Sequence, residues 1–378
     1  MKIIIIGPAH PLRGGLASFN ERLAKEFQLQ GNEVSIYTFS LQYPNFIFPG
    51  TTQYSTEPAP KDLKIKVCIN SVNPFNWIKV GTHLKNENAD LIIVRYWLPL
   101  MGPCLGTILR KAKKNNRTKV VCIADNIIPH EKRFGDKPFT KYFVKPVDAF
   151  ITMSEKVLLD LRLFEKNKPA QIVPHPLYDN FGDKVSKEEA RKKLGINHQE
   201  FVMLFFGFIR NYKGLDILLD AIKIIKDKEN PNFNFKVLIA GEFYEDRKKY
   251  DEQIEKLGIG NLLILHTDFI ADSEVKYYFC AADMVIQPYR NSTQSGVTPL
   301  AFHYEVPMIV TNVGGLPIML ANETVGLVAE PNAISIAKKV EEYYRVNGQV
   351  YYLRNLINEK QKYSWAKMAQ TILAIAQQ

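Results

Sequence analysis

The sequence lacks the features that define several large classes of protein. No apolar run reaches the roughly 18 residues that a membrane-spanning helix needs. The four cysteines are scattered without a C-x-x-C pair, which favours reduced thiols and argues against a structural zinc site. The seven histidines show no H-E-x-x-H or other metal-ligand spacing. We therefore expect no metal site and no membrane span, and we predict that the opening MKIIIIGPAH forms a first β-strand.

The sequence has fewer acidic than basic residues. The chain of 378 residues carries 49 lysines and arginines against 39 aspartates and glutamates, which gives a net charge of +10. Such a balance fits nucleic acid, an anionic membrane surface or a phosphate-bearing substrate as partner. The sequence has no zinc finger, RNP motif or dense Lys/Arg tract, so we expect no nucleic-acid partner. The other two partners are compatible with each other and both stay open.

Short β-rich runs alternate with longer amphipathic stretches along the whole chain. This alternation predicts an α/β fold of parallel sheets covered by helices. The runs are almost continuously apolar, as expected of strands that are buried on both faces of a sheet. The predicted strands cover 2–6, 33–39, 63–67, 91–96, 119–124, 149–153, 201–206, 235–240, 261–266, 284–289 and 307–312, and the predicted helices include 16–30, 103–114, 214–228, 246–257 and 332–346.

Two domains are predicted, because the strand series restarts near residue 200 and the chain is too long for one ordinary core. Prolines, a glycine and mixed polarity over 173–187 mark the connection between them. Residues 41–60 are predicted to be an ordered loop. The predicted boundaries are a first domain over 1–175, a linker over 176–189, a second domain over 190–363, and an amphipathic helix over 364–378 that packs back on the first domain.

Two loops at strand ends are candidates for binding phosphate. The first ends in Gly14-Gly15, directly before a predicted helix whose free N–H groups attract anions. A tight turn without a ligand fits these residues equally well, and the dinucleotide motif G-x-G-x-x-G is absent. The second loop begins at Gly207 and carries Arg210 and Lys213. Two cations before a helix N-terminus favour a diphosphate over a solvated basic loop.

The segment 207–221, GFIRNYKGLDILLDA, resembles the donor-diphosphate segment of the family 4 glycosyltransferases, whose fold is called GT-B. Gly14-Gly15 falls where these enzymes have a glycine-rich loop that faces the cleft. The closing stretch SWAKMAQTIL resembles their last helix. The resemblance covers nearly the whole chain, since VPHPLYDNF (173–181) and QPYRNSTQSGVTPLAFHYEVPMIVTNVGG (287–315) also match family segments in order. It is closest to a bacterial subgroup that assembles surface polysaccharides or glycolipids.

The resemblance implies two Rossmann-like domains that face each other across a cleft and a transfer from a nucleotide-diphosphate sugar with retention of configuration. It implies no cofactor and no essential metal, and the chain has no D-x-D motif, the metal signature of the other large glycosyltransferase fold. By similarity, Gly14 and Gly15 approach the donor phosphate and sugar, and Arg210 and Lys213 hold the diphosphate. The stretch from Asp268 to Ile270 is expected near the base.

The sequence departs from the family at a pair of glutamates that usually contact the sugar and the ribose. Here Gln294 and Phe302 occupy those positions. Gln294 still offers a hydrogen bond to a sugar hydroxyl, but it brings no charge, and Phe302 offers no polar group. We interpret the turn around Gln294 as donor-binding through its backbone N–H groups. The residues assigned to this turn are Gln294, Ser295, Gly296, Val297 and Thr298.

Three further polar residues are candidates at strand ends. Many relatives place a histidine after the strand matching 119–124, and this chain has Asp125 there, with His130 five residues on. We predict that either contacts a sugar hydroxyl or the acceptor, so both are candidate catalytic residues; a loop residue without a function is the alternative. Glu242 follows the strand 235–240 and is a candidate replacement for a missing sugar contact.

Basic residues close an apolar helix in the segment 105–119 of the first domain, and they mix with aromatics in the segment 134–146. Cations near a helix C-terminus explain the first segment without any partner. The alternative is an anionic membrane surface, which would make the protein a cytoplasmic enzyme peripheral to the inner face of the cell membrane. The predicted function is glycosyl transfer to a carbohydrate or lipid-linked acceptor. A nucleotide-sugar epimerase of the same fold and a non-catalytic nucleotide-sugar-binding relative remain alternatives.

Overall fold

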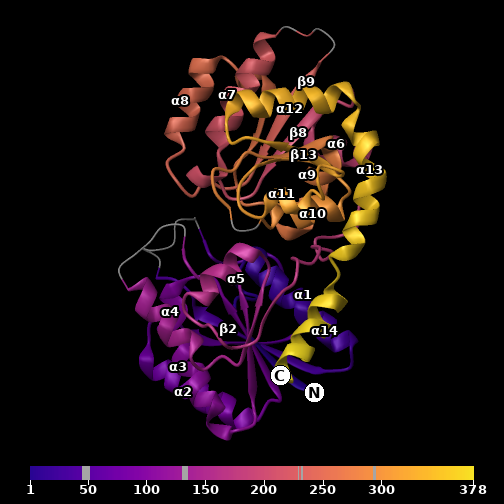
Figure 1. The fold of residues 1–378 in the computed structure, drawn as a ribbon. Coiled ribbons are helices and arrows are strands. Elements are labelled where there is room, and N and C mark those ends of the chain that lie inside the picture. The colour runs from indigo at the N-terminus through magenta and orange to yellow at the C-terminus, as the bar shows by residue number, and fades with distance from the viewer. Residues whose placement is uncertain (45–51, 130–134, 229, 231–232, 293–294) are drawn as a thin grey trace. The chain divides into compact units, whose positions relative to one another are not determined.

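The computed structural model describes residues 1–44, 52–129, 135–228, 230, 233–292 and 295–378. The chain divides into two compact units. The first unit comprises Met1–Pro176 together with Ser364–Gln378, and the second comprises Leu177–Tyr363 (Figure 1). In the described residues no helix combines the length and apolar character that crossing a membrane requires.

The first unit is built on a fully parallel sheet with the strand order β3-β2-β1-β4-β5-β6-β7. The order reverses between β1 and β4, so the chain leaves the sheet in opposite directions on the two sides of this point. The strands are β1 Lys2–Ile6, β2 Glu33–Leu41, β3 Lys64–Asn70, β4 Leu91–Tyr96, β5 Lys119–Ala124, β6 Ala149–Thr152 and β7 Ala170–Ile172. The helices are α1 Gly15–Leu29, α2 Pro74–Glu87, α3 Gly102–Ala112, α4 Asp136–Val144, α5 Glu155–Arg162 and α14 Trp365–Ala376, with short 3-10 turns η1 Pro99–Met101 and η2 Lys113–Asn115.

Helices cover both faces of this sheet. Alternate residues of the strands form one buried cluster with apolar side chains from α2, α3, α4 and α5. On the other face lie α1 and α14, and α14 contacts α1, β5 and β6 (Figure 1). Because both faces are buried, each central strand is apolar along its whole length, as in the fully buried β4. The prediction of a parallel α/β sheet and of a closing helix on this unit is confirmed.

The second unit repeats the architecture with the strand order β10-β9-β8-β11-β12-β13, again fully parallel. Its order reverses between β8 and β11. The strands are β8 Phe201–Phe206, β9 Phe235–Ala240, β10 Leu263–His266, β11 Met284–Gln287, β12 Met308–Thr311 and β13 Gly326–Ala329. The helices are α6 Lys187–Leu194, α7 Leu215–Asp227, α8 Lys248–Leu257, α9 Val275–Ala281, α10 Val297–His303, α11 Leu316–Met319, α12 Ala333–Arg345 and α13 Gly348–Glu359, with 3-10 turns η3 Asn211–Lys213, η4 Gly260–Leu262, η5 Asp272–Glu274 and η6 Lys360–Lys362.

The structure differs from the sequence-based expectation mainly in short elements. Strands β7 and β13 were not predicted, because runs of three and four residues are too short to show a period. The first part of the predicted strand 261–266 belongs to the 3-10 turn η4. The second unit begins at Leu177, and α6 begins at Lys187, within the segment predicted to be a linker. Residues 45–51 of the predicted loop lie outside the described residues.

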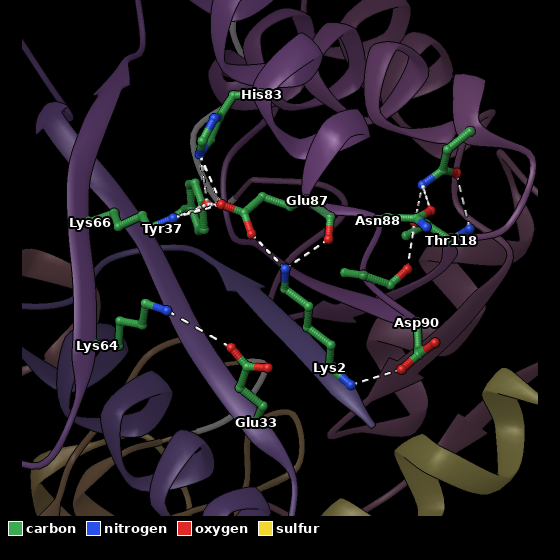
Figure 2. A network of polar contacts seen from close by, with 12 residues as sticks. Lys2, Glu33, Tyr37, Lys64, Lys66, His83, Glu87, Asn88, Asp90 and Thr118 are labelled. Carbon is green, nitrogen blue, oxygen red and sulfur yellow. Dashed lines mark hydrogen bonds and ion pairs between the residues drawn. The ribbon is translucent and has the colours of Figure 1, made fainter.

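A polar network joins the first three strands to α2 (Figure 2). The Glu87 carboxylate accepts hydrogen bonds from Lys2 Nζ at 2.6 Å, Lys66 Nζ at 2.8 Å and the Tyr37 hydroxyl at 3.1 Å. His83 lies one helical turn earlier, with its Nε2 3.1 Å from the same carboxylate. The hydrogen bond from Lys2, followed by that from Lys66, lowers the pKa of Glu87 to about 2. The network therefore stabilises the unit only while Glu87 is ionised.

Substitution Glu87→Gln is expected to destabilise the protein in a pH-dependent way. The lowered pKa, 4.5 to about 2, corresponds to roughly 3 kcal/mol of stability at neutral pH. This stability is present above pH 4.5 and is lost as the pH falls toward 2, because the unfolded chain takes up the proton first. Urea unfolding should show a deficit for the variant at pH 7 that shrinks by about half near pH 3. Glu252→Gln, which alters an exposed pair with Lys248, is the control and should change little; a deficit independent of pH would contradict the assignment.

Candidate functional site

The carboxyl ends of the strands beside the two reversal points carry most of the candidate residues. In open parallel α/β sheets ligands bind at this edge, because the loops on either side diverge there and leave a crevice. In the second unit the loop after β8 holds Gly207, Arg210 and Lys213, and the loop after β11 holds Arg290. In the first unit Gly14 follows β1 and Asp125 follows β5.

Lys213 is the most unusual charge of the second unit. It ends the 3-10 turn η3 and is only 8% exposed. Its Nζ lies 2.8 Å from the point where a Cβ on Gly207 would be, so only a glycine leaves room for it. Gly207 also has φ +95°, a conformation that favours glycine. The ammonium group lies 5.4 Å from the ring centroid of Tyr289.

No carboxylate of the described residues forms an ion pair with Lys213. Burial, and secondarily the positive charge of Arg210, lowers the pKa of Lys213 to about 8. A buried cation without a counter-charge is destabilising, because desolvation is not offset by attraction. An anion bound beside Gly207 would supply the missing charge, and the start of α7 next to it favours an anion as well.

Aromatic side chains connect the basic loop with the neighbouring strand ends. Arg210 is exposed, and its guanidinium lies 4.9 Å from the ring centroid of Tyr244. Tyr244 packs against Phe208 at 4.3 Å, and Phe208 lies 6.4 Å from Phe269 in a nearly parallel arrangement. The loop after β8 is thus continuous with the segment after β10, where Phe269 lies.

A cavity of about 380 Å³ opens at the end of β10. Ile270, predicted near the donor, lines it together with Asp268 and Phe269. On its wall the Nδ1 atom of His266 lies 3.0 Å from the hydroxyl of Tyr278. Burial raises the pKa of Tyr278 to about 12, so its hydroxyl stays protonated at neutral pH. The cavity offers an aromatic wall and polar groups, which suits a flat heterocycle.

The shape of the basic loop depends on Arg290, a residue that the sequence analysis did not select. Its guanidinium pairs with both oxygens of Asp216 in α7, at 2.7 Å for Nη1 and Oδ1, and donates to the carbonyl of Asn211 at 3.0 Å. Its own backbone N–H donates to the carbonyl of Tyr212. Arg290 therefore joins the loops after β8 and β11. A basic residue just after a predicted strand was the available signal.

The predicted donor-binding turn is described from Ser295 onward; Gln294 lies outside the described residues. Ser295 Oγ accepts a hydrogen bond from the Val297 N–H at 3.1 Å, and Gly296 is the N-cap of α10. Thr298 is fully buried and its hydroxyl is bonded to the Gln287 side chain at 3.0 Å. The Thr298 side chain thus supports the turn from below, and any ligand contact would come from its backbone or from Ser295.

Gly14 and Gly15 lie at the start of α1 in the first unit. Gly14 is the N-cap with φ +98° and ψ 173°, and its carbonyl accepts from the N–H groups of Ala17 and Ser18. α1 has no acidic residue in its first turn, so the positive end of its dipole is not neutralised within the helix. Gly15 is exposed. The arrangement agrees with an anion-facing turn.

Asp125 is held by a partner that the sequence analysis did not identify. Arg95, near the end of β4, donates from Nε and Nη2 to the two carboxylate oxygens of Asp125, both at 2.5 Å. Arg95 is 2% exposed and Asp125 5% exposed. A carboxylate bonded to a guanidinium through both oxygens is an acceptor with a fixed orientation, not a free base. His130, the second candidate, lies outside the described residues.

Comparisons with known proteins agree with this arrangement. Residues 186–362 match the family model described as glycosyl transferases group 1. Over 374 residues the chain is 25% identical to an uncharacterized glycosyltransferase of Methanocaldococcus jannaschii, covering 97% of this chain and 95% of that protein. The second unit therefore carries a group 1 glycosyl transferase domain, and the protein is a glycosyltransferase. The predicted resemblance to glycosyltransferases and the predicted enzyme class are thereby confirmed.

Solved structures of glycosyltransferases share the fold. HepE of Anabaena, in complex with UDP-glucose, is similar with a TM-score of 0.74 at 15% identity, covering 98% of each chain. WaaG, a glycosyltransferase involved in lipopolysaccharide biosynthesis, is similar with a TM-score of 0.70 at 19% identity, covering 98% of this chain and 99% of that one. At these identities the likeness shows the GT-B fold, which confirms the predicted fold class.

This glycosyltransferase lacks an acidic group at Phe302. This ring is fully buried and packs against Tyr363 with centroids 5.1 Å apart, so the position belongs to the core. Glu242, the candidate substitute, is 5% exposed at the end of β9, and its carbonyl accepts from the Ile209 N–H at 2.8 Å. Glu242 therefore lies beside the loop that carries Lys213, at the right edge of the sheet for a ligand contact.

Substitution Lys213→Met is expected to stabilise the ligand-free enzyme. The pKa of Lys213 is lowered from 10.5 to about 8, so burial of the ammonium destabilises the fold by roughly 3 kcal/mol at pH 7. Since the unfolded chain binds this proton more tightly, the penalty is full below pH 8 and is relieved as the pH rises toward 10.5. Thermal melting should show a higher melting temperature for the variant at pH 7 and a smaller gain at pH 10. Lys192→Met, at an exposed lysine, is the control; a lower melting temperature for Lys213→Met would contradict the prediction.

Proposed function

We propose that this glycosyltransferase transfers a sugar from a nucleotide-diphosphate sugar to a carbohydrate or lipid-linked acceptor, with retention of configuration and without a metal. The observation that carries the proposal is the buried Lys213 ammonium beside Gly207, which has no carboxylate partner among the described residues. Fixed cations at a site of developing negative charge are the groups that such a transfer requires.

The proposed reaction places the donor diphosphate against the basic loop. The bond between the anomeric carbon of the sugar and the diphosphate oxygen breaks, and its electron pair goes to that oxygen. The acceptor hydroxyl oxygen bonds to the same carbon, and its proton leaves with the nucleoside diphosphate. Lys213 and Arg210 stabilise the charge that grows on the diphosphate, and the start of α7 adds to their field. Because these cations are supplied by the protein, we propose that no divalent metal takes part.

The cavity at the end of β10 is proposed to bind the base of the donor. It is lined by Ile270 and Phe269, and Phe208 links Phe269 with the loop that carries Arg210. The complex of HepE with UDP-glucose supports a nucleotide sugar as the donor class. Glu242 and the turn from Ser295 to Thr298 are proposed to contact the donor sugar or phosphate.

In the first unit, the start of α1 at Gly14-Gly15 is proposed to meet the donor phosphate and sugar. Asp125 is proposed to accept a hydrogen bond from a sugar hydroxyl, since its two oxygens are fixed by Arg95. His130 is kept as a second candidate for this contact. WaaG, described as involved in lipopolysaccharide biosynthesis, supports the proposed role in cell-surface glycan synthesis.

An anionic membrane is proposed to bind the enzyme through α4. Lys137, Lys141 and Lys145 are exposed on and just after this helix and form no ion pair within the described residues. Tyr142 is 38% exposed beside them, with the Arg110 guanidinium 3.6 Å from its ring centroid. Phe143, expected to be part of this mixed surface, is instead fully buried, because its ring stacks on Tyr96. Lysines and one aromatic ring make a weak, charge-dependent contact.

Removal of Lys213 is expected to abolish most of the turnover. A panel of UDP-, dTDP-, GDP- and ADP-linked sugars would identify the donor through release of nucleoside diphosphate that depends on added acceptor. Lys213→Ala and Arg210→Ala should each lower kcat at a saturating concentration of the sugar donor by about 10²- to 10³-fold. Removing one hydrogen-bond donor from an oxyanion hole has an effect of this size in other enzymes. Lys213→Arg should recover only part, since a planar fork does not replace a compact ammonium.

Lys192→Ala, at an exposed lysine of α6, is the matched control and should keep full turnover. The same assay in excess chelator should give an unchanged rate. A folded Lys213→Ala enzyme with normal kcat would remove the basic loop from the mechanism. Release of nucleoside diphosphate that never depends on an acceptor would favour an epimerase or a binding protein over a transferase.

Reversing the charge of α4 is expected to weaken membrane binding. Lys137→Glu, Lys141→Glu and Lys145→Glu together should remove most sedimentation with phosphatidylglycerol vesicles, because each basic residue near the surface contributes about 1 kcal/mol. The same three changes at Lys248, Lys249 and Lys256 of α8 alter the net charge equally and should leave binding intact. Equal binding of the wild type to neutral phosphatidylcholine vesicles would contradict the proposal.

A further inference from the structure

Arg95 is a charged residue in the middle of a buried sheet. It follows Val94 in β4, pairs in register with Ile123 of β5, and is the largest side chain of the chain that is almost completely buried. Its Nε and Nη2 groups donate to Asp125, its one ion-pair partner among the described residues. Moving an ion out of water costs several kcal/mol, so a guanidinium in this buried position needs an explanation other than its solubility in water.

At the reversal point of the first sheet, the arginine joins the end of β5, through Asp125, to helix α1, through Phe19. Its guanidinium carbon lies 3.8 Å from the ring centroid of Phe19, which is four residues after Gly15 in α1. Phe19 in turn packs edge-on against His175 at 5.1 Å and Trp365 at 4.8 Å. Arg95 therefore fixes the distance between the first turns of α1 and the end of β5, where Asp125 lies.

The neighbouring histidine does not compete for Asp125. Burial, partly opposed by a hydrogen bond with the carbonyl of Pro176, lowers the pKa of His175 to about 3, and the positive charge of Arg95 lowers it further. His175 is therefore neutral at physiological pH. Asp125 is therefore left to pair with the Arg95 guanidinium, which binds both of its oxygens.

The pair is not arranged for greatest stability. The third donor group of the guanidinium, Nη1, is buried and has no hydrogen-bond partner within the described part of the chain, and the same holds for Oδ1 of Asn20 in α1. Leaving a buried polar group unsatisfied costs about 1–3 kcal/mol, and such groups concentrate at functional sites. A well-packed apolar pair at these positions would stabilise the fold as well or better.

We propose that Arg95 is a positioning residue for glycosyl transfer. It holds the Asp125 carboxylate in one orientation, and it fixes that carboxylate relative to the Gly14-Gly15 start of α1. This inference rests on the proposed function of Asp125 and of the glycine turn, and it adds the residue through which both act. Arg95 itself contacts neither donor nor acceptor, so its loss should slow turnover without weakening nucleotide binding, which belongs to the basic loop of the second unit.

The test compares Arg95→Met and Arg95→Lys with the wild type in the transfer assay and in calorimetric titration with the nucleoside diphosphate that the wild type releases. A misplaced contact lowers the rate by up to about 10²-fold, so kcat for Arg95→Met should fall on that order while the dissociation constant stays within about 2-fold. Arg95→Lys, which keeps the charge but not the fork, should restore part of kcat. Asp125→Asn should give a similar loss, and the double variant Arg95→Met/Asp125→Asn should lose no more, because the two residues act as one unit.

A matched control lies in the second unit. Arg191 is 2% exposed and donates to Asp283 at 2.7 Å, at the amino ends of β8 and β11 and so at the opposite edge of that sheet. Arg191→Met should lower the melting temperature but leave kcat unchanged below the transition. If Arg95→Met does not fold, Arg95→Met/Asp125→Leu removes both charges, and it should be stable yet equally slow.

A folded Arg95→Met or Arg95→Met/Asp125→Leu enzyme with wild-type kcat would overturn the inference, as would a loss of nucleotide binding equal to the loss in rate. Failure of the proposed function has a different result: the wild-type enzyme itself would neither bind a nucleoside diphosphate nor transfer a sugar.

Discussion

Burying a lysine ammonium is costly when no carboxylate of the described residues pairs with it, and the loops at the carboxyl edge of the second sheet are arranged around such a group, Lys213. Gly207 leaves room for the Lys213 ammonium, and the ring of Tyr289 lies near it. Arg290 holds the loop in place by binding Asp216 and the carbonyl of Asn211, which lie on the two sides of Lys213 in the sequence. Each of these contacts positions the cation, and none neutralises it. An anion that enters this place gains the attraction that the protein leaves unused.

The first unit is also a parallel sheet with a reversal point, but its buried cation has a carboxylate partner. At its reversal point the guanidinium of Arg95 is paired through two hydrogen bonds with Asp125, so the charges cancel locally. In the proposed reaction, the Lys213 cation, which has no carboxylate partner among the described residues, would receive the donor diphosphate. The paired charges of Arg95 and Asp125 would meet neutral hydroxyl groups.

The sequence predicted the central strands well, because sheets buried on both faces leave apolar runs such as KIIII and LIIVRY. The positions of Lys213 and Asp125 at strand ends also followed from the pattern. Their surroundings could not be predicted: Arg95 meets Asp125 only through the parallel pairing of β4 with β5, 30 residues apart along the chain. An arginine inside an apolar run was a visible signal that a buried partner had to exist. At Phe302 the resemblance predicted a position in the site, but the structure shows a ring that is buried in the core.

The most direct test of the account is the number of protons taken up when a nucleoside diphosphate binds. Bound phosphate must raise the pKa of Lys213 from about 8, so calorimetric titration at pH 8 in buffers of different ionisation enthalpy should show uptake of about half a proton per molecule bound. In the Lys213→Met variant this uptake should vanish. Tight binding by the wild type without proton uptake, or the same uptake by the variant, would show that the buried lysine is not the group that receives the diphosphate.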